Sequence, residues 1–289
     1  MKHLSAAACV FVSCVPVLCC GGPAADRPDG GAATASAVPV ELRLEPYGRL
    51  KTLSLAVGSA AGPFILDTGG GFNVLTPTVA AEAGCRPFGR VVGFRASGEQ
   101  IAAERCQPLQ ARAAGWADTG QWKVFDLMAL LGNAPEVAGL VALPLFEGRT
   151  VTLDLAGNLL TLETEASAAR RVAGMKAIAV RPCRQAGGAS LDLMVSVETP
   201  DGPIWLEMDS GNTGPVLISP HAARQLGVTF ASGEARDITL DVSGLGPVPV
   251  TAVERETIYD GLLNAAWLEQ LVITLDLRSM RAWVRPRAT

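Results

Sequence analysis

The sequence predicts an all-β protein built from two similar lobes. Short apolar runs bounded by Gly, Pro, Asn or Asp recur along most of the 289 residues, which is typical of β-strands. Helical signals are few and short. An internal duplication makes one half of the chain resemble the other, and a composition of 49% hydrophobic and 18% charged residues suffices for a sizeable core.

The duplication rests on two pairs of matching segments. Residues 64–84 read FILDTGGGFNVLTPTVAAEAG and residues 204–227 read IWLEMDSGNTGPVLISPHAARQLG. Residues 139–162 and 261–284 also match, since each runs from Gly-Leu through a short helix into a strand with Leu-Asp-Leu. Two matches in the same order indicate a repeated unit of more than 100 residues.

The copies define the expected domains. We expect an N-terminal lobe at residues 39–162, a C-terminal lobe at 175–289, and between them a charged, Ala-rich linker at 163–174. Both lobes are expected to be closed β-barrels with a cleft between them. Strands are expected at residues 50–57, 63–66, 72–75, 151–155, 191–197, 203–208, 237–242, 248–253 and 271–275.

Short helices are expected at equivalent places in the two copies. Thr76-Pro77 and Ser219-Pro220 each combine a helix N-cap residue with proline at the first helical position. The expected helices span residues 77–83, 220–226 and 265–270.

The N-terminus has the features of an export signal. A basic start precedes an apolar run at residues 4–18, which is too short to span a bilayer, so residues 1–20 are interpreted as a signal peptide. The run ends in VLCCGG, which resembles a bacterial lipobox with Cys20 as the acylated residue. Residues 21–38 are interpreted as a flexible tether. We therefore expect a cell-envelope lipoprotein, with plain secretion as the alternative and membrane contact only through the lipid anchor.

Composition excludes several classes of function. The net charge is −4 and no Lys/Arg cluster is interleaved with aromatic residues, so no nucleic-acid partner is expected. The two histidines are His3, in the predicted leader, and His221. Catalytic triads with histidine and multi-histidine metal sites therefore lack their parts, and no metal or cofactor is expected. Any chemistry must come from carboxylates.

Three cysteines follow the leader: Cys85, Cys106 and Cys183. Cys85 and Cys106 are close enough in sequence to join the two ends of one hairpin-rich segment, and an oxidising compartment would favour a disulfide there. Free buried thiols are the alternative.

The candidate site is a pair of aspartates, Asp67 and Asp209, each at the end of an apolar strand. A buried carboxylate requires hydrogen bonds, which glycine turns and neighbouring hydroxyls supply. Two such turns from symmetric halves would bring the carboxylates together, so that they share a proton. The ionised one would then activate water, while the protonated one would hydrogen-bond the carbonyl under attack. The turns have the sequences Asp67-Thr68-Gly69 and Asp209-Ser210-Gly211.

On these motifs the chain resembles the pepsin/retropepsin-like aspartic protease superfamily, and in size its bacterial two-lobed members. The resemblance covers nearly all of residues 40–285 and implies that Asp67 and Asp209 are catalytic. It also implies that Thr213 braces the second aspartate, whereas the corresponding first-lobe position is Gly71, which has no hydroxyl. The implied supporting residues are Thr68, Gly69, Ser210 and Gly211.

Two further family elements are altered. The family carries a hydrophobic-hydrophobic-Gly element late in each lobe, but this chain ends the element with Ala142 and Asn264. The resemblance also implies a flap over the cleft, which residues 90–104 would form. Phe94 stands where a tyrosine would be expected, and the turn residues Ser97 and Gly98 would form the tip.

The expected activity is hydrolysis of peptide bonds by a paired-aspartate endopeptidase. The alternative is a catalytically inactive relative that binds a polypeptide or assists envelope assembly. The expected partner is a polypeptide in the cleft, and the internal symmetry makes dimerisation unnecessary, so a monomer is expected. Asp154 and Asp276 are interpreted as structural residues, and Trp205 and Trp283 as core residues. Trp116 and Trp122 fall in a predicted loop and are candidates to line the cleft.

Overall fold

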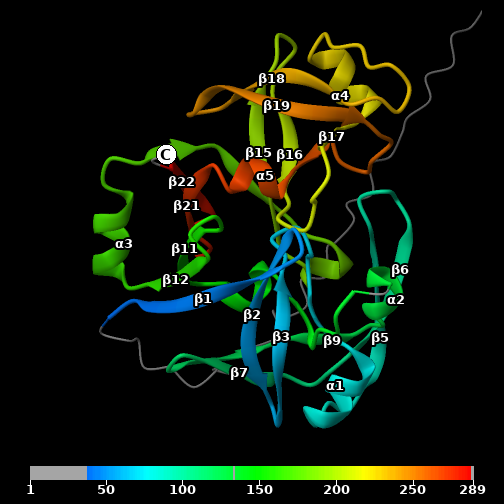
Figure 1. Cartoon of the computed structure of the whole chain (residues 1–289), viewed down its shortest axis with the longest axis vertical. Helices are drawn as coiled ribbons and strands as arrows, with labels where there is room; N and C mark the ends of the chain where they lie inside the picture. Colours follow the sequence, from blue (N-terminus) through cyan, green and yellow to red (C-terminus); the bar gives the residue numbers. More distant parts are fainter. Residues whose placement is uncertain (1–37, 133, 288–289) are drawn as a thin grey trace, which may run out of the picture. The chain divides into compact units, whose positions relative to one another are not determined.

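The computed structural model describes residues 38–132 and 134–287, which belong to one compact unit at residues 33–289. The predicted signal peptide, Cys20 and the tether up to residue 37 lie outside the described residues. What the structure describes is mostly β, in agreement with the all-β part of the predicted fold class (Figure 1).

The strands form two sheets in the described part of the chain. Fifteen strands form the first: β1 (Val40–Tyr47), β2 (Leu50–Val57), β3 (Ala60–Leu66), β4 (Asn73–Leu75), β5 (Phe88–Phe94), β6 (Gln100–Arg105), β7 (Leu109–Ala113), β8 (Trp116–Gly120), β9 (Trp122–Val124), β10 (Gly139–Val141), β11 (Thr150–Asp154), β12 (Leu159–Glu163), β13 (Lys176–Ile178), β21 (Leu271–Asp276) and β22 (Arg281–Pro286). Seven form the second: β14 (Val180–Cys183), β15 (Asp192–Glu198), β16 (Ile204–Met208), β17 (Val216–Ile218), β18 (Arg236–Val242), β19 (Gly246–Glu254) and β20 (Gly261–Leu263).

Short helices connect the strands. The α-helices are α1 (Pro77–Glu82), α2 (Met128–Leu131), α3 (Glu165–Val172), α4 (Pro220–Gln225) and α5 (Ala265–Leu268), and the 3₁₀ helices are η1 (Leu143–Phe146) and η2 (Ala186–Gly188). Ser219 caps α4 through its hydroxyl, as predicted, whereas Thr76 makes no side-chain cap at α1. None of the helices in the described residues is long and apolar enough to cross a membrane.

The segment predicted as a linker is structured. Glu163 ends β12, and the rest of residues 163–174 is largely helix α3, which packs on β12 and β21 (Figure 1). Thr164 and Ser167 form a reciprocal capping box at its start, at 2.9 and 3.0 Å. The Ala-rich composition on which the linker prediction rested also favours an α-helix.

The duplicated segments adopt the same pairing pattern. In the first copy β10 lies parallel to β3 and antiparallel to β4, and in the second β20 lies parallel to β16 and antiparallel to β17. β4 and β17 also each gain a parallel neighbour, β9 and β19 respectively. The repeated sequence therefore encodes a repeated arrangement around the ends of β3 and β16.

The second sheet closes into a ring. Its order runs β15-β16-β20-β17-β19-β18, and β18 pairs again with β15 at Val197 and Val242. Six strands thus form a small closed barrel, whose interior is filled by buried aliphatic side chains such as Leu193, Leu206 and Leu240.

The two copies meet in one sheet at their equivalent strands. β11 pairs antiparallel with β21, with Thr152 opposite Thr274, and the two threonine hydroxyls lie 2.9 Å apart. Asp154 and Asp276 accept hydrogen bonds from backbone N–H groups of the turns that follow, at 2.8 and 3.1 Å. Both aspartates are structural, as expected.

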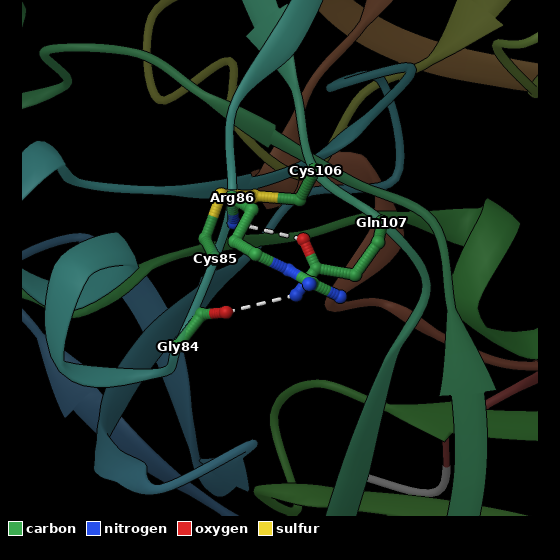
Figure 2. The surroundings of a disulfide bond; sticks show 5 residues. All are labelled: Gly84, Cys85, Arg86, Cys106 and Gln107. Atoms are coloured by element: carbon green, nitrogen blue, oxygen red, sulfur yellow. Dashed lines mark hydrogen bonds between the residues drawn. A yellow bond between two sulfur atoms is a disulfide. The ribbon is translucent and has the colours of Figure 1, made fainter.

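A disulfide joins Cys85, just after α1, to Cys106, just after β6, with a Cα–Cα distance of 5.4 Å (Figure 2). The Gln107 side chain holds the same two segments together. It accepts from the Arg86 N–H at 2.8 Å and donates to the Gly84 carbonyl at 2.8 Å. Among the cysteines of the described residues, Cys183 is free.

The tryptophans reverse the sequence expectation. Trp116 and Trp122 were expected in a loop, but they are the first residues of β8 and β9 and are buried. The sequence pattern missed these two strands, which direct both side chains into the core. Trp205 and Trp283 are only half-buried. Each instead lies under an arginine guanidinium, 4.4 and 4.6 Å from the ring centroid.

Candidate active site

Asp67 and Asp209 follow directly after β3 and β16, the equivalent strands of the two copies. Each of these strands is held by a parallel neighbour, β10 or β20. The Asp67 N–H continues that ladder by donating to the Val141 carbonyl at 2.9 Å. The strand ends therefore fix the position of both aspartates.

The turns are tied to each other by reciprocal hydrogen bonds through the buried side chains of Thr68 and Ser210. The Thr68 hydroxyl donates to the Met208 carbonyl at 2.6 Å and accepts from the Ser210 N–H at 3.0 Å. In the symmetric arrangement, the Ser210 hydroxyl donates to the Leu66 carbonyl at 3.1 Å and accepts from the Thr68 N–H at 3.0 Å. These four bonds lock the two turns in one geometry.

The glycines of the motifs bring the two carboxylates face to face. A Cβ on Gly69 would lie 2.8 Å from Asp209 Cγ, and a Cβ on Gly211 would lie 2.7 Å from Asp67 Cγ. No larger residue fits at either position, so each glycine permits the close approach of the opposite carboxylate. The Gly69 N–H donates to Asp67 Oδ1 at 3.0 Å, and the Gly211 N–H donates to Asp209 Oδ1 at 2.7 Å.

Burial raises the pKa of both aspartates above the usual range. For Asp67 the desolvation outweighs the hydrogen bonds that it accepts from Gly69 and from Asp209. For Asp209 the desolvation is reinforced by the negative charge of Asp67, so its pKa lies well above the usual value. The pair therefore retains a proton well above pH 4, which is the state that general acid and base catalysis requires.

The bracing of Asp209 differs from the expectation. In the described part of the chain the Thr213 hydroxyl makes no hydrogen bond to it; the Asn212 N–H donates to Asp209 Oδ1 instead, at 3.0 Å. The Asn212 side chain folds back on its own loop, accepting from the Gly214 N–H at 3.1 Å and donating to the Pro215 carbonyl at 3.1 Å. This asparagine turn takes the place that the sequence comparison assigned to Thr213.

Gly71 departs from the family pattern for a reason visible in the structure. Its φ is +65°, and a Cβ there would lie 3.3 Å from Asp192 Oδ2. A serine or threonine would thus be strained and crowded against a buried carboxylate of the second copy.

The altered late elements have structural roles. The Asn264 side chain caps α5 by accepting from the Trp267 N–H at 2.9 Å, and it donates to the Gly214 carbonyl at 2.7 Å, which steadies the loop after Asp209. In the first copy, the Ala142 N–H donates to Asn73 Oδ1 at 3.0 Å. Ala142 and Asn264 therefore preserve the supports around the site.

The segment predicted as a flap forms a hairpin of β5 and β6, with its turn at residues 95–99. Gly98 has a φ of +84°, which the tight turn requires. Phe94 and Ser97 line a cavity of about 500 Å³ that also reaches Asp67 and Asp209. The flap candidates therefore lie in the same cavity as the paired aspartates.

The hairpin is fastened across the cavity to the second copy. The Phe94 N–H donates to Gln185 Oε1 at 2.9 Å, and Gln185 Nε2 donates to the Phe94 carbonyl at 3.3 Å and to the Tyr259 hydroxyl at 2.6 Å. The Ile258 N–H donates to the Ala96 carbonyl at 2.9 Å. We call these contacts the flap latch; they roof the cavity.

Sequence reasoning missed several polar residues that line the cavity, among them Gln185, Asp192, Glu207 and Tyr259. For Asp192 and Glu207 a signal was present, because each is a carboxylate inside an otherwise apolar strand. Within residues 38–132 and 134–287, no cluster of three or more His, Cys, Asp or Glu side chains has the arrangement of a metal site.

Comparison with known proteins gives a fold but no family. No protein-family model and no curated protein sequence matches the chain. Among solved structures it is similar to basic 7S globulin from soybean, with a TM-score of 0.55, 14% identity and coverage of 87% of this chain and 95% of that one. It is also similar to conglutin gamma, a basic 7S globulin from lupine seeds, with a TM-score of 0.55, 10% identity and the same coverages.

The chain has a distantly pepsin-like fold. At these identities the likeness concerns the backbone alone and carries no statement about activity. It agrees with the paired turns, because the same repeated strand arrangement positions Asp67 and Asp209.

Proposed function

We propose that this protein is a two-lobed aspartic peptidase in which Asp67 and Asp209 activate water for attack on a peptide carbonyl. The observation that carries the proposal is the face-to-face pair of half-buried carboxylates, each against the glycine of the opposite turn. The raised pKa of both groups supports it, since the pair then keeps the proton that the reaction needs.

The steps follow from the two protonation states. The ionised aspartate accepts a proton from water as the water attacks the carbonyl carbon, and the protonated one hydrogen-bonds the carbonyl oxygen. Proton transfer back through the pair then reaches the leaving nitrogen, which breaks the C–N bond and restores the starting state. The four hydrogen bonds of Thr68 and Ser210 keep both carboxylates in position throughout.

The proposed substrate is a polypeptide segment that enters beneath the flap hairpin. Because the flap latch roofs the cavity, entry requires the contacts of Gln185 to open. The export features of residues 1–38 support a place in the cell envelope, anchored through Cys20, or secretion, and a monomer supplies both aspartates from one chain.

The second candidate is a non-catalytic protein that binds a polypeptide in the same cavity or assists envelope assembly. Two observations favour it. The flap latch ties the hairpin to the second copy beside the cavity, and the two similar solved structures are named as basic 7S globulins rather than as peptidases.

Cleavage of a denatured-protein library by the purified full chain between pH 3 and pH 8 tests the proposal. We expect cleavage at acidic to neutral pH and a loss of at least about 100-fold in Asp67→Asn and in Asp209→Asn, because each removes one partner of the acid–base pair.

Asp201→Asn is the matched control, since Asp201 is exposed in the turn between β15 and β16. It should cleave like the wild type. A folded wild-type chain that cleaves nothing across this pH range, or aspartate variants that retain full activity, would favour the binding protein.

A further inference from the structure

The cavity contains a second pair of carboxylates, Asp192 on β15 and Glu207 on β16, beside the paired aspartates. The two strands pair with Met194 opposite Glu207. Residues two apart on a strand share a face, so Asp192 and Glu207 lie on the same face of the barrel wall. Their side chains are 2% and 3% exposed.

These carboxylates have fewer partners than buried acids usually have, although the Gly71 backbone contributes a hydrogen bond that lowers the pKa of Asp192. Asp192 Oδ1 is fully buried without a hydrogen-bond partner in the described structure. Among the same residues, the Glu207 carboxylate makes no hydrogen bond and no ion pair. Arg184, whose charge acts on Asp192, is already engaged by Glu147 at 2.6 Å and by the Ser190 carbonyl at 3.1 Å. Two other cations line the cavity: Arg95, which is paired with Glu99, and Lys123, which lies over the Phe72 ring.

An unpaired buried carboxylate is costly, and two on one cavity wall are more so. Two neighbouring polar groups of this cavity, Gln185 and Tyr259, are hydrogen-bonded to each other. The orphaned oxygen of Asp192 therefore indicates that a donor is supplied by whatever occupies the cavity.

The second pair is adjacent to the reacting centre. Asp192 Oδ2 lies 3.3 Å from the Cβ position of Gly71, in the loop that follows Asp67. The electrostatic influence of Asp67 reaches Asp192, and Glu207 is influenced by both Asp67 and Asp209. A group bound there would belong to a residue close to the scissile bond.

We propose that Asp192 and Glu207 form a subsite for a cationic nitrogen of the substrate, either the side chain of lysine or arginine or a free N-terminal amine. The inference rests on the proposed peptidase function and assigns it a substrate class. A cation seated there donates to the free oxygen of Asp192 and neutralises the charge on this wall.

The ionisation behaviour agrees with this role. Burial, followed by the charge of Asp67, raises the pKa of Asp192 to about 8, and burial raises the pKa of Glu207 well above its usual value. Cys183 and Tyr259, whose pKa values burial also raises, interact electrostatically with Asp192 and supply no positive charge. Of the two cations that line the cavity, Arg95 is paired with Glu99, and burial lowers the pKa of Lys123. With a pKa of about 8, Asp192 carries a proton at neutral pH, and a cation that binds beside it displaces that proton.

The test compares peptides that carry lysine or its neutral isostere norleucine at each position around the cleaved bond. We expect kcat/KM to favour lysine by at least about tenfold at one position, and the double variant Asp192→Asn/Glu207→Gln to bring that ratio close to one. Both substitutions preserve side-chain shape. Glu198→Gln, at the exposed end of β15, is the control and should keep the preference.

A binding arm separates this inference from the peptidase proposal. Neutral statine peptides with lysine or norleucine are titrated calorimetrically into the full wild-type chain in buffers of different ionisation enthalpy. We expect tighter binding of the lysine peptide with release of a proton. N-acetylated and free-amine versions distinguish a side chain from an N-terminal amine as the bound cation.

The outcomes are distinct. Equal cleavage and equal binding of lysine and norleucine peptides by wild type would overturn the cationic subsite while leaving the peptidase intact. A binding preference without any cleavage would keep the subsite and refute the peptidase. Because the lysine-to-norleucine ratio is measured in wild type, the inference stays testable even if a variant does not fold.

Discussion

At the scale of single residues, the site depends on four hydrogen bonds that contain no carboxylate. Thr68 is fully buried, and its hydroxyl bonds to two backbone groups of the opposite turn, at Met208 and Ser210. The Ser210 hydroxyl makes the equivalent bonds to the first turn, at Leu66 and Thr68. These hydroxyls set the separation of Asp67 and Asp209.

Thr68→Val tests this reading, since valine keeps the shape but removes the hydroxyl. The change leaves the Met208 carbonyl and the Ser210 N–H buried without partners, at about 1–3 kcal/mol each. We expect the free energy of unfolding to fall by about 2–5 kcal/mol, measured by urea denaturation. Thr239→Val, at an exposed position of β18, should change it by less than about 0.5 kcal/mol. Equal effects of both would refute the role of the hydroxyl.

Residue patterns predicted part of this site. Asp67 and Asp209 stand out because their motifs are repeated in matching contexts, and the sequence therefore placed them together. Asp192 and Glu207 were missed because their separation depends on how β15 pairs with β16, which no local pattern encodes. Thr213 was assigned by analogy, whereas the structure uses the backbone of Asn212.

At the scale of elements, the flap hairpin is the part of the site that must move. It is joined to the rest of the cavity by the flap latch, in which Gln185 bonds to both backbone groups of Phe94 and to Tyr259. The disulfide between Cys85 and Cys106 lies at the ends of the hairpin, so its base is fixed while its tip is held by side-chain contacts.

Gln185→Ala removes the side-chain part of the latch. Each lost bond contributes about 0.5–1.5 kcal/mol, so amide exchange at Phe94 should accelerate at least about fivefold. The Gly98 N–H, which bonds within the turn at 2.8 Å, should keep its protection. Hydrogen exchange followed by NMR measures both. Gln121 is exposed and precedes β9, so Gln121→Ala should change neither exchange rate. An unchanged exchange rate at Phe94 in the Gln185 variant would refute the flap latch.

Strand prediction succeeded for several alternating or apolar runs, such as β2 and β15, but it missed β1 although its sequence alternates. β7 to β9 were missed because their sequences mix small and charged residues and owe their strand form to pairing with distant segments. The helix α3 was read as a linker because its polarity hides that it packs against β12 on one face only.

At the scale of the whole molecule, four carboxylates share one cavity: the half-buried Asp67 and Asp209 and the buried Asp192 and Glu207. All four have raised pKa values, with burial as the largest cause. The folded state therefore binds more protons than the unfolded state above pH 4. Such a site lowers the stability of the folded state as pH rises, and other buried contacts must compensate for this loss.

The stability of the fold should accordingly fall as pH rises. An unfolded aspartate has a pKa of 3.8, and that of Asp192 in the fold is about 8, so unfolding releases a proton between these values. Stability from protonated Asp192 is complete below pH 4 and lost as pH approaches 8. Asp276, whose pKa is lowered, acts only below pH 4, and Lys123, with a lowered pKa, acts in the opposite sense.

Thermal unfolding of wild type and Asp192→Asn between pH 4 and pH 9 isolates the contribution of Asp192 to the pH dependence of stability. The two proteins share every other titratable group. We expect the Tm of wild type to fall relative to that of the variant by at least about 5 °C over this range, since each pKa unit corresponds to about 1.4 kcal/mol. Glu198→Gln should follow wild type. Parallel curves of Tm against pH for wild type and Asp192→Asn would mean that Asp192 is ionised in the folded state. The prediction of a protonated Asp192 on the cavity wall would then be wrong.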